Sequence, residues 1–339
     1  MDRQVMETDI VVTGFGPAAA GFLLTLAPEL AKTKEDGTPL YGSKAMPGMP
    51  LQVMCYERAD DTGFGVSGIV TKADAIRATF PGVDLAKEIP NAADVTNIEL
   101  TLDGERFDLT QGSILDYRRS LNIRTGRLSR EVRWRSPAGR VYALCFERVV
   151  SLRRLHSIAM KVTVRPEQDT AVKLRSGIDG RMTNDGSQHF SEGQTRSYDD
   201  KTVLQFTPRT VQSNIHFVIS TVHRFTLDGE AVDPARSLSI VRRRMVTGFT
   251  QTLTAGQTLV MEKFATVFTT RDREAEGLTL PELQALGLEQ LRRDEQTGFD
   301  ALAAESAESW AEKVWDRVPI EIDGPAFDLF ALRFAQYHM

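Results

Sequence analysis

Two short stretches near the N-terminus carry residues that could bind a phosphate-containing ligand. In TGFGPAAAG, residues 13–21, Gly14, Gly16 and Ala19 have the spacing of a dinucleotide-binding turn. The first glycine permits a tight turn, the second lets the backbone approach a pyrophosphate, and the small third residue allows close helix–strand packing. Glu57 ends the next apolar run, where it could accept hydrogen bonds from an adenosine ribose. The alternative for Glu57 is a solvated carboxylate at a strand end.

These residues lie in an expected strand–helix–strand unit over residues 1–92. The apolar run DIVV precedes the glycines, a helical apolar pattern follows them, and LQVMCYER is a second apolar run. We therefore expect a partial Rossmann-like β-α-β unit. The segments that carry a family resemblance are DIVVTGFGPAAAG, VMCYERADDTGFGVSG and IVTKADAIRATFP. They resemble the N-terminus of FAD-dependent geranylgeranyl-reductase-like flavoproteins, which implies FAD as a ligand of Gly14, Gly16, Ala19 and Glu57. One such unit could hold the adenosine part but could not enclose the redox-active ring.

Residues 97–271 have a different pattern, in which apolar and polar residues alternate. The alternation is clearest in NIELTL, SIAMKVTV and VQSNIHFVI, and it predicts half-buried antiparallel strands. Turn signals such as Asp103-Gly104 and Asp228-Gly229 separate the runs. We therefore expect a mainly β fold built on a large antiparallel β-sandwich. Residues 181–202 are polar and rich in turn-forming residues, which predicts a long loop or a wide hairpin tip.

Residues 278–339 are expected to form a C-terminal helical linker. Thr279 and Glu282 have the spacing of a capping box, and Leu283 and Leu291 begin an apolar helical face. The linker also contains Trp310 and Trp315, which could stack on a sugar, and Glu305 and Glu308, which resemble paired carboxylates. We expect the tryptophans to pack in the core and the glutamates to lie on the solvated face of a charged helix.

Several blocks of this region occur in the order expected for one enzyme family. They are LTLDGERFDL, ILDYRRSLNIRTGRLSREVRWRSPAGR, FERVVSLRRLHSIAMKVTV, LRSGIDGRMTNDGSQHF and ESWAEKVWDRVPIEIDGPAFDLFALRFAQYHM. Residues 97–339 thereby resemble the N-terminal part of glycoside hydrolase family 65, which includes maltose, trehalose and kojibiose phosphorylases. The resemblance implies a β-sandwich, a helical linker and the first helix of an (α/α)₆ barrel. It also implies a saccharide partner and a homodimer formed through the sandwich.

The family inverts configuration at the anomeric carbon. A carboxylic acid protonates the glycosidic oxygen while phosphate attacks from the opposite face, which follows the logic of inverting glycosidases. Both the acid and the phosphate pocket belong to the barrel. With the barrel expected to be absent beyond its first helix, the resemblance implies no catalytic residue in this chain. The sandwich is not expected to require a cofactor.

Other polar residues have ordinary structural interpretations. Asp179 and Asn184 lie beside glycines and are expected to form turns, with a loop that reaches a saccharide as the alternative. The run Arg242-Arg243-Arg244 lies in a strand-like stretch, where alternation would divide it between two faces. A solvated edge or ion pairs with carboxylates of the sheet are expected there, and phosphate binding is the alternative. The spacing of the histidines predicts no metal site.

The composition excludes several classes of protein. The net charge of −5 and the pI near 5.7 argue against a nucleic-acid partner, and no apolar run reaches the ~18 residues of a membrane span. The only two cysteines, Cys55 and Cys145, support neither a disulfide framework nor a thiolate metal site, and they fit a cytoplasmic protein.

The leading hypothesis is the N-terminal β-sandwich portion of a family 65 α-glucoside phosphorylase or hydrolase, without catalysis of its own. Its expected parts are residues 1–92, 97–271 and 278–339. One alternative is an FAD- or nucleotide-binding flavoprotein-like protein. The other is a non-functional chimeric fragment of two families.

Overall fold

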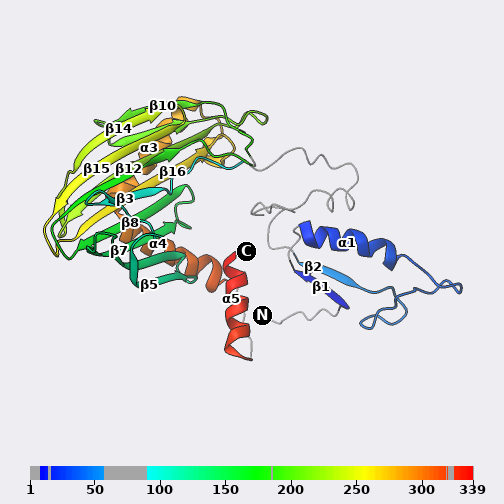
Figure 1. The fold of residues 1–339 in the computed structure, drawn as a ribbon. Helices are drawn as coiled ribbons and strands as arrows, with labels where there is room; N and C mark the ends of the chain where they lie inside the picture. The colour runs from blue at the N-terminus through cyan, green and yellow to red at the C-terminus, as the bar shows by residue number, and fades with distance from the viewer. Residues whose placement is uncertain are drawn as a thin grey trace. The chain divides into compact units, whose positions relative to one another are not determined.

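The computed structural model describes residues 8–13, 17–56, 90–184, 186–317, 319 and 324–338. The chain divides into two compact units, Met1–Ile89 and Pro90–Met339. Figure 1 labels the helices and strands of each unit. None of the described helices is both long and apolar enough to cross a membrane.

The N-terminal unit contains β1 (Ile10–Thr13), α1 (Pro17–Leu30) and β2 (Val53–Tyr56). The two strands are parallel, with Ile10 opposite Val53. Asp9 fixes the start of this pair, because its carboxylate accepts hydrogen bonds from the backbone N–H groups of Lys44 and Gln52 at 2.7 and 2.8 Å. One parallel pair with one helix is a smaller structure than a doubly wound sheet, so the Rossmann-like unit stays a prediction.

The second unit is mainly β, and its antiparallel sheets confirm the predicted sandwich. Among the described residues, the larger sheet has the order β10-β11-β12-β16-β8-β7-β6-β5, with β13 beside β12, and the smaller has the order β14-β15-β9-β3-β4. The bounds of the larger sheet's strands are β5 (Ser113–Asn122), β6 (Arg127–Arg135), β7 (Val141–Val150), β8 (Ser157–Pro166), β10 (Gln194–Tyr198), β11 (Val203–Thr207), β12 (Phe217–Leu227), β13 (Glu230–Val232) and β16 (Leu259–Thr269). Those of the smaller sheet are β3 (Ile98–Leu102), β4 (Glu105–Arg106), β9 (Thr170–Asp179), β14 (Ala235–Val241) and β15 (Arg244–Leu253).

The largest core cluster lies between the two sheets. Trp134 and Tyr142 of the larger sheet pack in it with Leu102 and Leu174 of the smaller sheet, and all four are buried. A polar contact also crosses the core, where the ammonium group of Lys263 on β16 donates a 2.8 Å hydrogen bond to the carbonyl of Gly177 on β9. Burial lowers the pKa of Lys263 to about 7.

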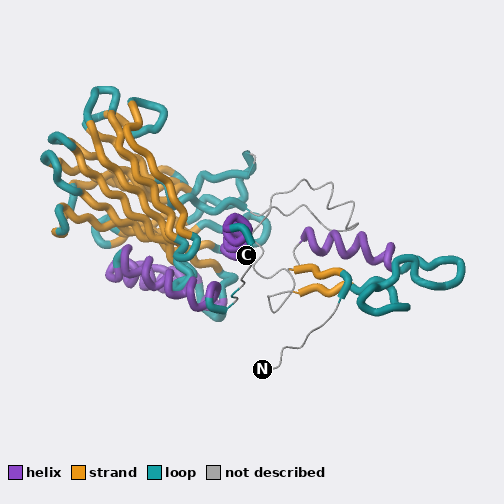
Figure 2. Tube along the Cα trace, turned by 90° about the horizontal axis from the view of Figure 1, so that it is seen from below, coloured by secondary structure: helices purple, strands orange, loops and turns teal. Residues whose placement is uncertain are grey.

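Helices cover the opposite face of the larger sheet, as Figure 2 shows. After the short helix η1 (Arg273–Ala275), α3 (Leu280–Thr297) and α4 (Phe299–Trp310) pack on it, followed by the π-helical turn η2 (Ala311–Trp315) and α5 (Ala326–His338). Phe264 of the sheet is buried against Leu291, Phe299 and Leu302 of these helices. The predicted apolar helical face is therefore confirmed.

Local signals in the sequence account for the ends of these helices. The capping box of Thr279 and Glu282 is present, as predicted. Gly298 separates α3 from α4 at a φ of 83°, and an added Cβ there would lie 2.4 Å from the guanidinium group of Arg224. Glycine is therefore required at this position both for its backbone conformation and for the space it leaves.

The strand signals are accurate at tight turns and less accurate at strand ends. Asp103-Gly104 and Asp228-Gly229 have positive φ throughout, as hairpin turns of this type require. The alternation in VQSNIHFVI predicts one strand, but β12 begins only at Phe217, and Val211 is exposed in a loop. The strand begins later than predicted because Asn214 has a φ of 55°, which is incompatible with an extended strand. The predicted polar loop of residues 181–202 contains β10, which pairs with β11 beyond the end of that loop.

Candidate functional site

The predicted dinucleotide-binding residues are largely outside the described part of the chain. Gly14, Gly16 and Glu57 are not among the described residues, and Ala19 lies in α1 with its side chain undescribed. FAD binding by these residues therefore stays a prediction.

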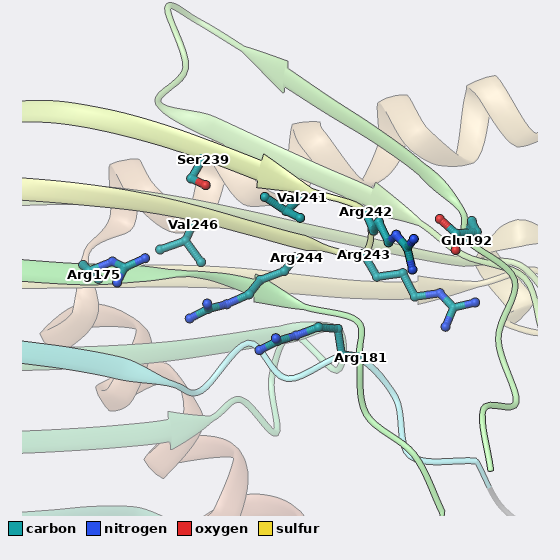
Figure 3. A pocket seen from close by; sticks show the side chains of 9 residues that line it. All are labelled: Arg175, Arg181, Glu192, Ser239, Val241, Arg242, Arg243, Arg244 and Val246. Atoms are coloured by element: carbon teal, nitrogen blue, oxygen red, sulfur yellow. The ribbon is translucent and has the colours of Figure 1, made fainter. Parts of the chain in front are cut away.

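A cavity of about 350 Å³ lies on the smaller sheet, near the turn between β14 and β15. We name it the arginine pocket and define it by its nine lining residues. Figure 3 shows their side chains gathered from β9, from the β14–β15 hairpin and from the segment between β9 and β10. They are Arg175, Arg181, Glu192, Ser239, Val241, Arg242, Arg243, Arg244 and Val246.

The run of three arginines enters this pocket because it forms a tight hairpin turn. Val241 pairs with Arg244, so Arg242 and Arg243 are the two turn residues, and Arg242 has a φ of 51°. The prediction that all three would lie on a strand with alternating directions is therefore wrong for the first two. A two-residue turn ends the alternation, which lets neighbouring side chains point into one cavity.

Three of the lining arginines form ion pairs with carboxylates, as expected for Arg244. Its guanidinium group lies 3.1 Å from a carboxylate oxygen of Glu99 on β3 and 3.6 Å from one of Asp179. Arg175 reaches the same Glu99 at 3.5 Å, and Arg181 reaches Asp179 at 2.6 Å. The hydrogen bond from Arg181 is the main reason that the pKa of Asp179 lies below its ordinary value.

The two Asx residues of this region differ in their roles. Asp179 is expected in a turn, but it ends β9 and pairs with Arg244 across the strands. Asn184 forms a local bridge with Ser187, and its side-chain oxygen accepts a 2.9 Å hydrogen bond from the backbone N–H of Asn91. A saccharide contact by this loop stays a prediction.

A second polar group, the sandwich–helix junction, fixes the linker helices on the larger sheet. We define it as Arg154, Asp294, Thr297 and Glu305. Arg154, in the turn between β7 and β8, lies 2.8 Å from Asp294 of α3 and 2.8 Å from Glu305 of α4, and it donates a 3.1 Å hydrogen bond to Thr297. The carboxylate of Asp294 is fully buried, so Arg154 supplies the positive charge that it needs.

The junction corrects one prediction about the linker. Glu305 is expected on the solvated face of its helix, but its side chain is only 36% exposed and is bonded to Arg154, whereas Glu308 is exposed. Helical spacing alone could not distinguish the two. The sequence patterns miss Arg154 altogether, because an arginine among other charged residues in a turn has the same local pattern as a solvated one.

The two linker tryptophans pack as predicted. Trp315 is buried, and its indole N–H donates a 2.9 Å hydrogen bond to the carbonyl of Arg124. Trp310 stacks on Trp315 and on Tyr337 of α5, with ring centroids 6.2 and 4.8 Å apart. These contacts connect the β5–β6 turn, the linker and α5, and they occupy both rings.

Comparisons with known proteins agree with this architecture. The family model of the N-terminal domain of glycosyl hydrolase family 65 matches residues 60–313, beginning upstream of the predicted start at residue 97. The chain is 37% identical over 256 residues to kojibiose phosphorylase from Halothermothrix orenii and 31% identical over 254 residues to kojibiose phosphorylase from Escherichia coli. Each alignment covers 74% of this chain and 32% of the relative.

A solved structure has the same fold. A putative kojibiose phosphorylase from the human microbiome superimposes with a TM-score of 0.65 at 16% identity, covering 73% of this chain and 31% of that one. The chain thus spans about a third of the length of these relatives. The comparisons support neither the flavoprotein-like alternative nor a chimeric fragment. With a family match over most of its length and an antiparallel sandwich followed by linker helices, the chain belongs to glycosyl hydrolase family 65 and carries that family's N-terminal domain.

Proposed function

We propose that residues 90–339 act as the N-terminal domain of an α-glucoside phosphorylase, with kojibiose as the first substrate to test. The observation that carries this proposal is the 37% identity to a kojibiose phosphorylase over 256 residues. In this proposal the domain positions a catalytic barrel and does not cleave glycosides by itself.

The sandwich–helix junction supports a positioning role. Arg154 and Lys161 of the sandwich region each contact a carboxylate of the helices, at Glu305 and Asp300, over distances of 2.8 and 2.7 Å. Such contacts set the direction in which the linker leaves the sheet. On α5, Phe327 and Phe330 remain 75% and 57% exposed. An apolar surface of this kind is typical of a surface that another domain covers.

The test asks whether this chain can replace the N-terminal domain of a relative. The chain would be co-expressed with the remaining two thirds of Halothermothrix orenii kojibiose phosphorylase, and phosphate-dependent release of glucose 1-phosphate from kojibiose, trehalose and maltose would be measured. We expect no release by either part alone and release from kojibiose by the two together. Arg154→Ala should reduce the recovered activity, and its exposed neighbour Arg153→Ala should not. Release of glucose 1-phosphate by this chain alone would overturn the non-catalytic role.

We also propose a homodimer through the sandwich, with β5 as the contact. Every residue of β5 is exposed, and β6 is its only partner among the described strands. An antiparallel pairing of two copies about the Tyr117–Arg118 bond would place Asp116 of each copy opposite Arg119 of the other. Opposite charges in facing positions of paired strands are stabilising, and like charges are destabilising.

Sedimentation of charge variants tests this arrangement. Asp116→Arg would bring like charges together and should give a monomer. The double variant Asp116→Arg/Arg119→Asp restores opposite charges and should recover the dimer. A dimer that survives in the single variant would exclude this pairing.

A further inference from the structure

The arginine pocket carries more positive charge than its neighbours neutralise. Glu192 lines the pocket, and Glu99 and Asp179 form ion pairs with lining arginines. These three carboxylates face five guanidinium groups, so that two positive charges are unbalanced. The five arginines are Arg175, Arg181, Arg242, Arg243 and Arg244.

The unbalanced charge lies at the turn. Arg242 is exposed, and its guanidinium group has no partner among the residues that the structure describes. Arg243 donates one hydrogen bond of 2.9 Å to the carbonyl of Phe190, and its Nε atom is buried without a partner. The Nε atom of Arg244, in contrast, faces a carboxylate oxygen of Asp179 at 3.6 Å. A buried donor without an acceptor is unfavourable, so an anionic ligand that accepts a hydrogen bond from the Nε atom of Arg243 would remove this cost.

We propose that the arginine pocket binds the dianionic phosphate group of a small phosphate ligand. A phosphate monoester carries about −1.5 to −2 charges at neutral pH, which matches the excess of two positive charges. The planar guanidinium group presents paired N–H donors that fit phosphate oxygens in a bidentate manner. A carboxylate ligand with a single charge would leave part of the excess uncompensated.

The remaining lining favours a phosphate attached to a sugar over free phosphate. The cavity of about 350 Å³ lies in the size range of small-molecule sites and is larger than a phosphate ion needs. Ser239 and Glu192 provide a hydroxyl and a carboxylate that could bond to sugar hydroxyls. This binding site is independent of the proposed positioning role, and its test uses no catalytic readout.

The experiment is calorimetric titration of the whole chain at an ionic strength of about 0.15 M with inorganic phosphate, glucose 1-phosphate and glucose. We expect saturable binding of glucose 1-phosphate, weaker binding of inorganic phosphate and none of glucose. Arg242→Gln/Arg243→Gln should weaken phosphate binding by at least about tenfold, because it removes charge-assisted hydrogen bonds. The matched control Arg106→Gln/Arg153→Gln removes the same charge from exposed residues outside the pocket. It should change the affinity by less than about twofold because exposed charges are screened.

A third variant tests whether a negative charge in the lining weakens phosphate binding, and it leaves the turn residues unchanged. Glu192→Gln removes the negative charge of the lining and should tighten inorganic phosphate several-fold. The proposal is overturned if neither phosphate ligand binds saturably, if the control loses as much affinity as the pocket variant, or if Glu192→Gln leaves inorganic phosphate binding unchanged. Stronger binding of inorganic phosphate than of glucose 1-phosphate would assign the pocket to the free ion, within the same proposal.

Discussion

The two units of the chain differ in how much of their own surface they bury. In the N-terminal unit, Ser43 is the only buried residue among those whose side chains are described, and Phe22, Tyr41 and Met49 are exposed. The sandwich unit buries Trp134 completely between two sheets that each supply an apolar face. Both units contain apolar runs. The difference indicates that an apolar run becomes a core only where a second layer covers it, and a pair of strands is too small to supply that layer.

The strongest test of this contrast replaces one phenylalanine in each unit. Phe264→Ala would remove a fully buried ring from the contact between the larger sheet and helices α3 and α4, and we expect a loss of about 3–5 kcal/mol in the free energy of unfolding. Phe22→Ala, at a position 46% exposed in α1, should change it by less than about 0.5 kcal/mol. Urea unfolding followed by tryptophan fluorescence measures the loss in Phe264→Ala, because all three tryptophans lie in the sandwich unit. Hydrogen exchange of the α1 amides measures the loss in Phe22→Ala. Equal losses in the two variants would contradict the contrast.

The next effect concerns the buried carboxylate at the junction. Arg154→Ala should destabilise the sandwich unit by about 2–3 kcal/mol, below the ~3–5 kcal/mol for breaking a fully buried pair, because Arg154 itself is 20% exposed. The added substitution Asp294→Asn should recover part of this loss, because it removes the charge left without a partner. Arg153→Ala serves as the control in the same urea measurement. If the double variant is no more stable than Arg154→Ala, the buried charge is not the cause.

Per pH unit, a smaller effect comes from the lysine that crosses the sandwich. The pKa of Lys263 is about 7 in the folded chain and near 10.5 when the side chain is exposed, so between these values the unfolded chain binds more protons. Stability should therefore rise with pH from about 7 to 10.5, by up to about 1.4 kcal/mol per pH unit. Lys263→Met should remove this contribution to the pH dependence of urea unfolding, and the exposed control Lys173→Met should keep it. The same slope in the unsubstituted chain and in Lys263→Met would be the contrary result.

The smallest expected effect is that of FAD. Because the core residues of the sandwich are buried against one another, added FAD should leave the urea midpoint of the sandwich unchanged. A yellow protein that loses its colour in Gly16→Val and Glu57→Ala would instead establish the predicted dinucleotide site. It would also give the N-terminal unit the covering layer that its described residues do not supply.

Much of the fold could be predicted from local patterns, because strand alternation, tight turns and the capping box act over a few residues. Met160, Val162 and Val164 are all buried on β8, as their period of two predicted. The polar clusters could not be predicted in this way. Arg181 and Arg243 meet at one cavity because β15 pairs with β9, and Arg154 reaches Asp294 across 140 positions of sequence. Only the pairing of distant strands and the packing of helices on a sheet bring such residues together.

The sheet order also has a consequence for how this chain folds. β8 pairs with β16, where Met160 lies opposite Lys263, and β3 pairs with β9, where Leu100 lies opposite Leu174. Chains whose contacts join distant residues close large loops before they gain stability, and they fold on timescales of about milliseconds to seconds. Helix α3 packs on β12 and β16 and α4 packs on β7 and β8, so both helices gain their apolar partners only when these strands are in place. Assembly of the sheet should therefore set the rate at which the linker helices become ordered.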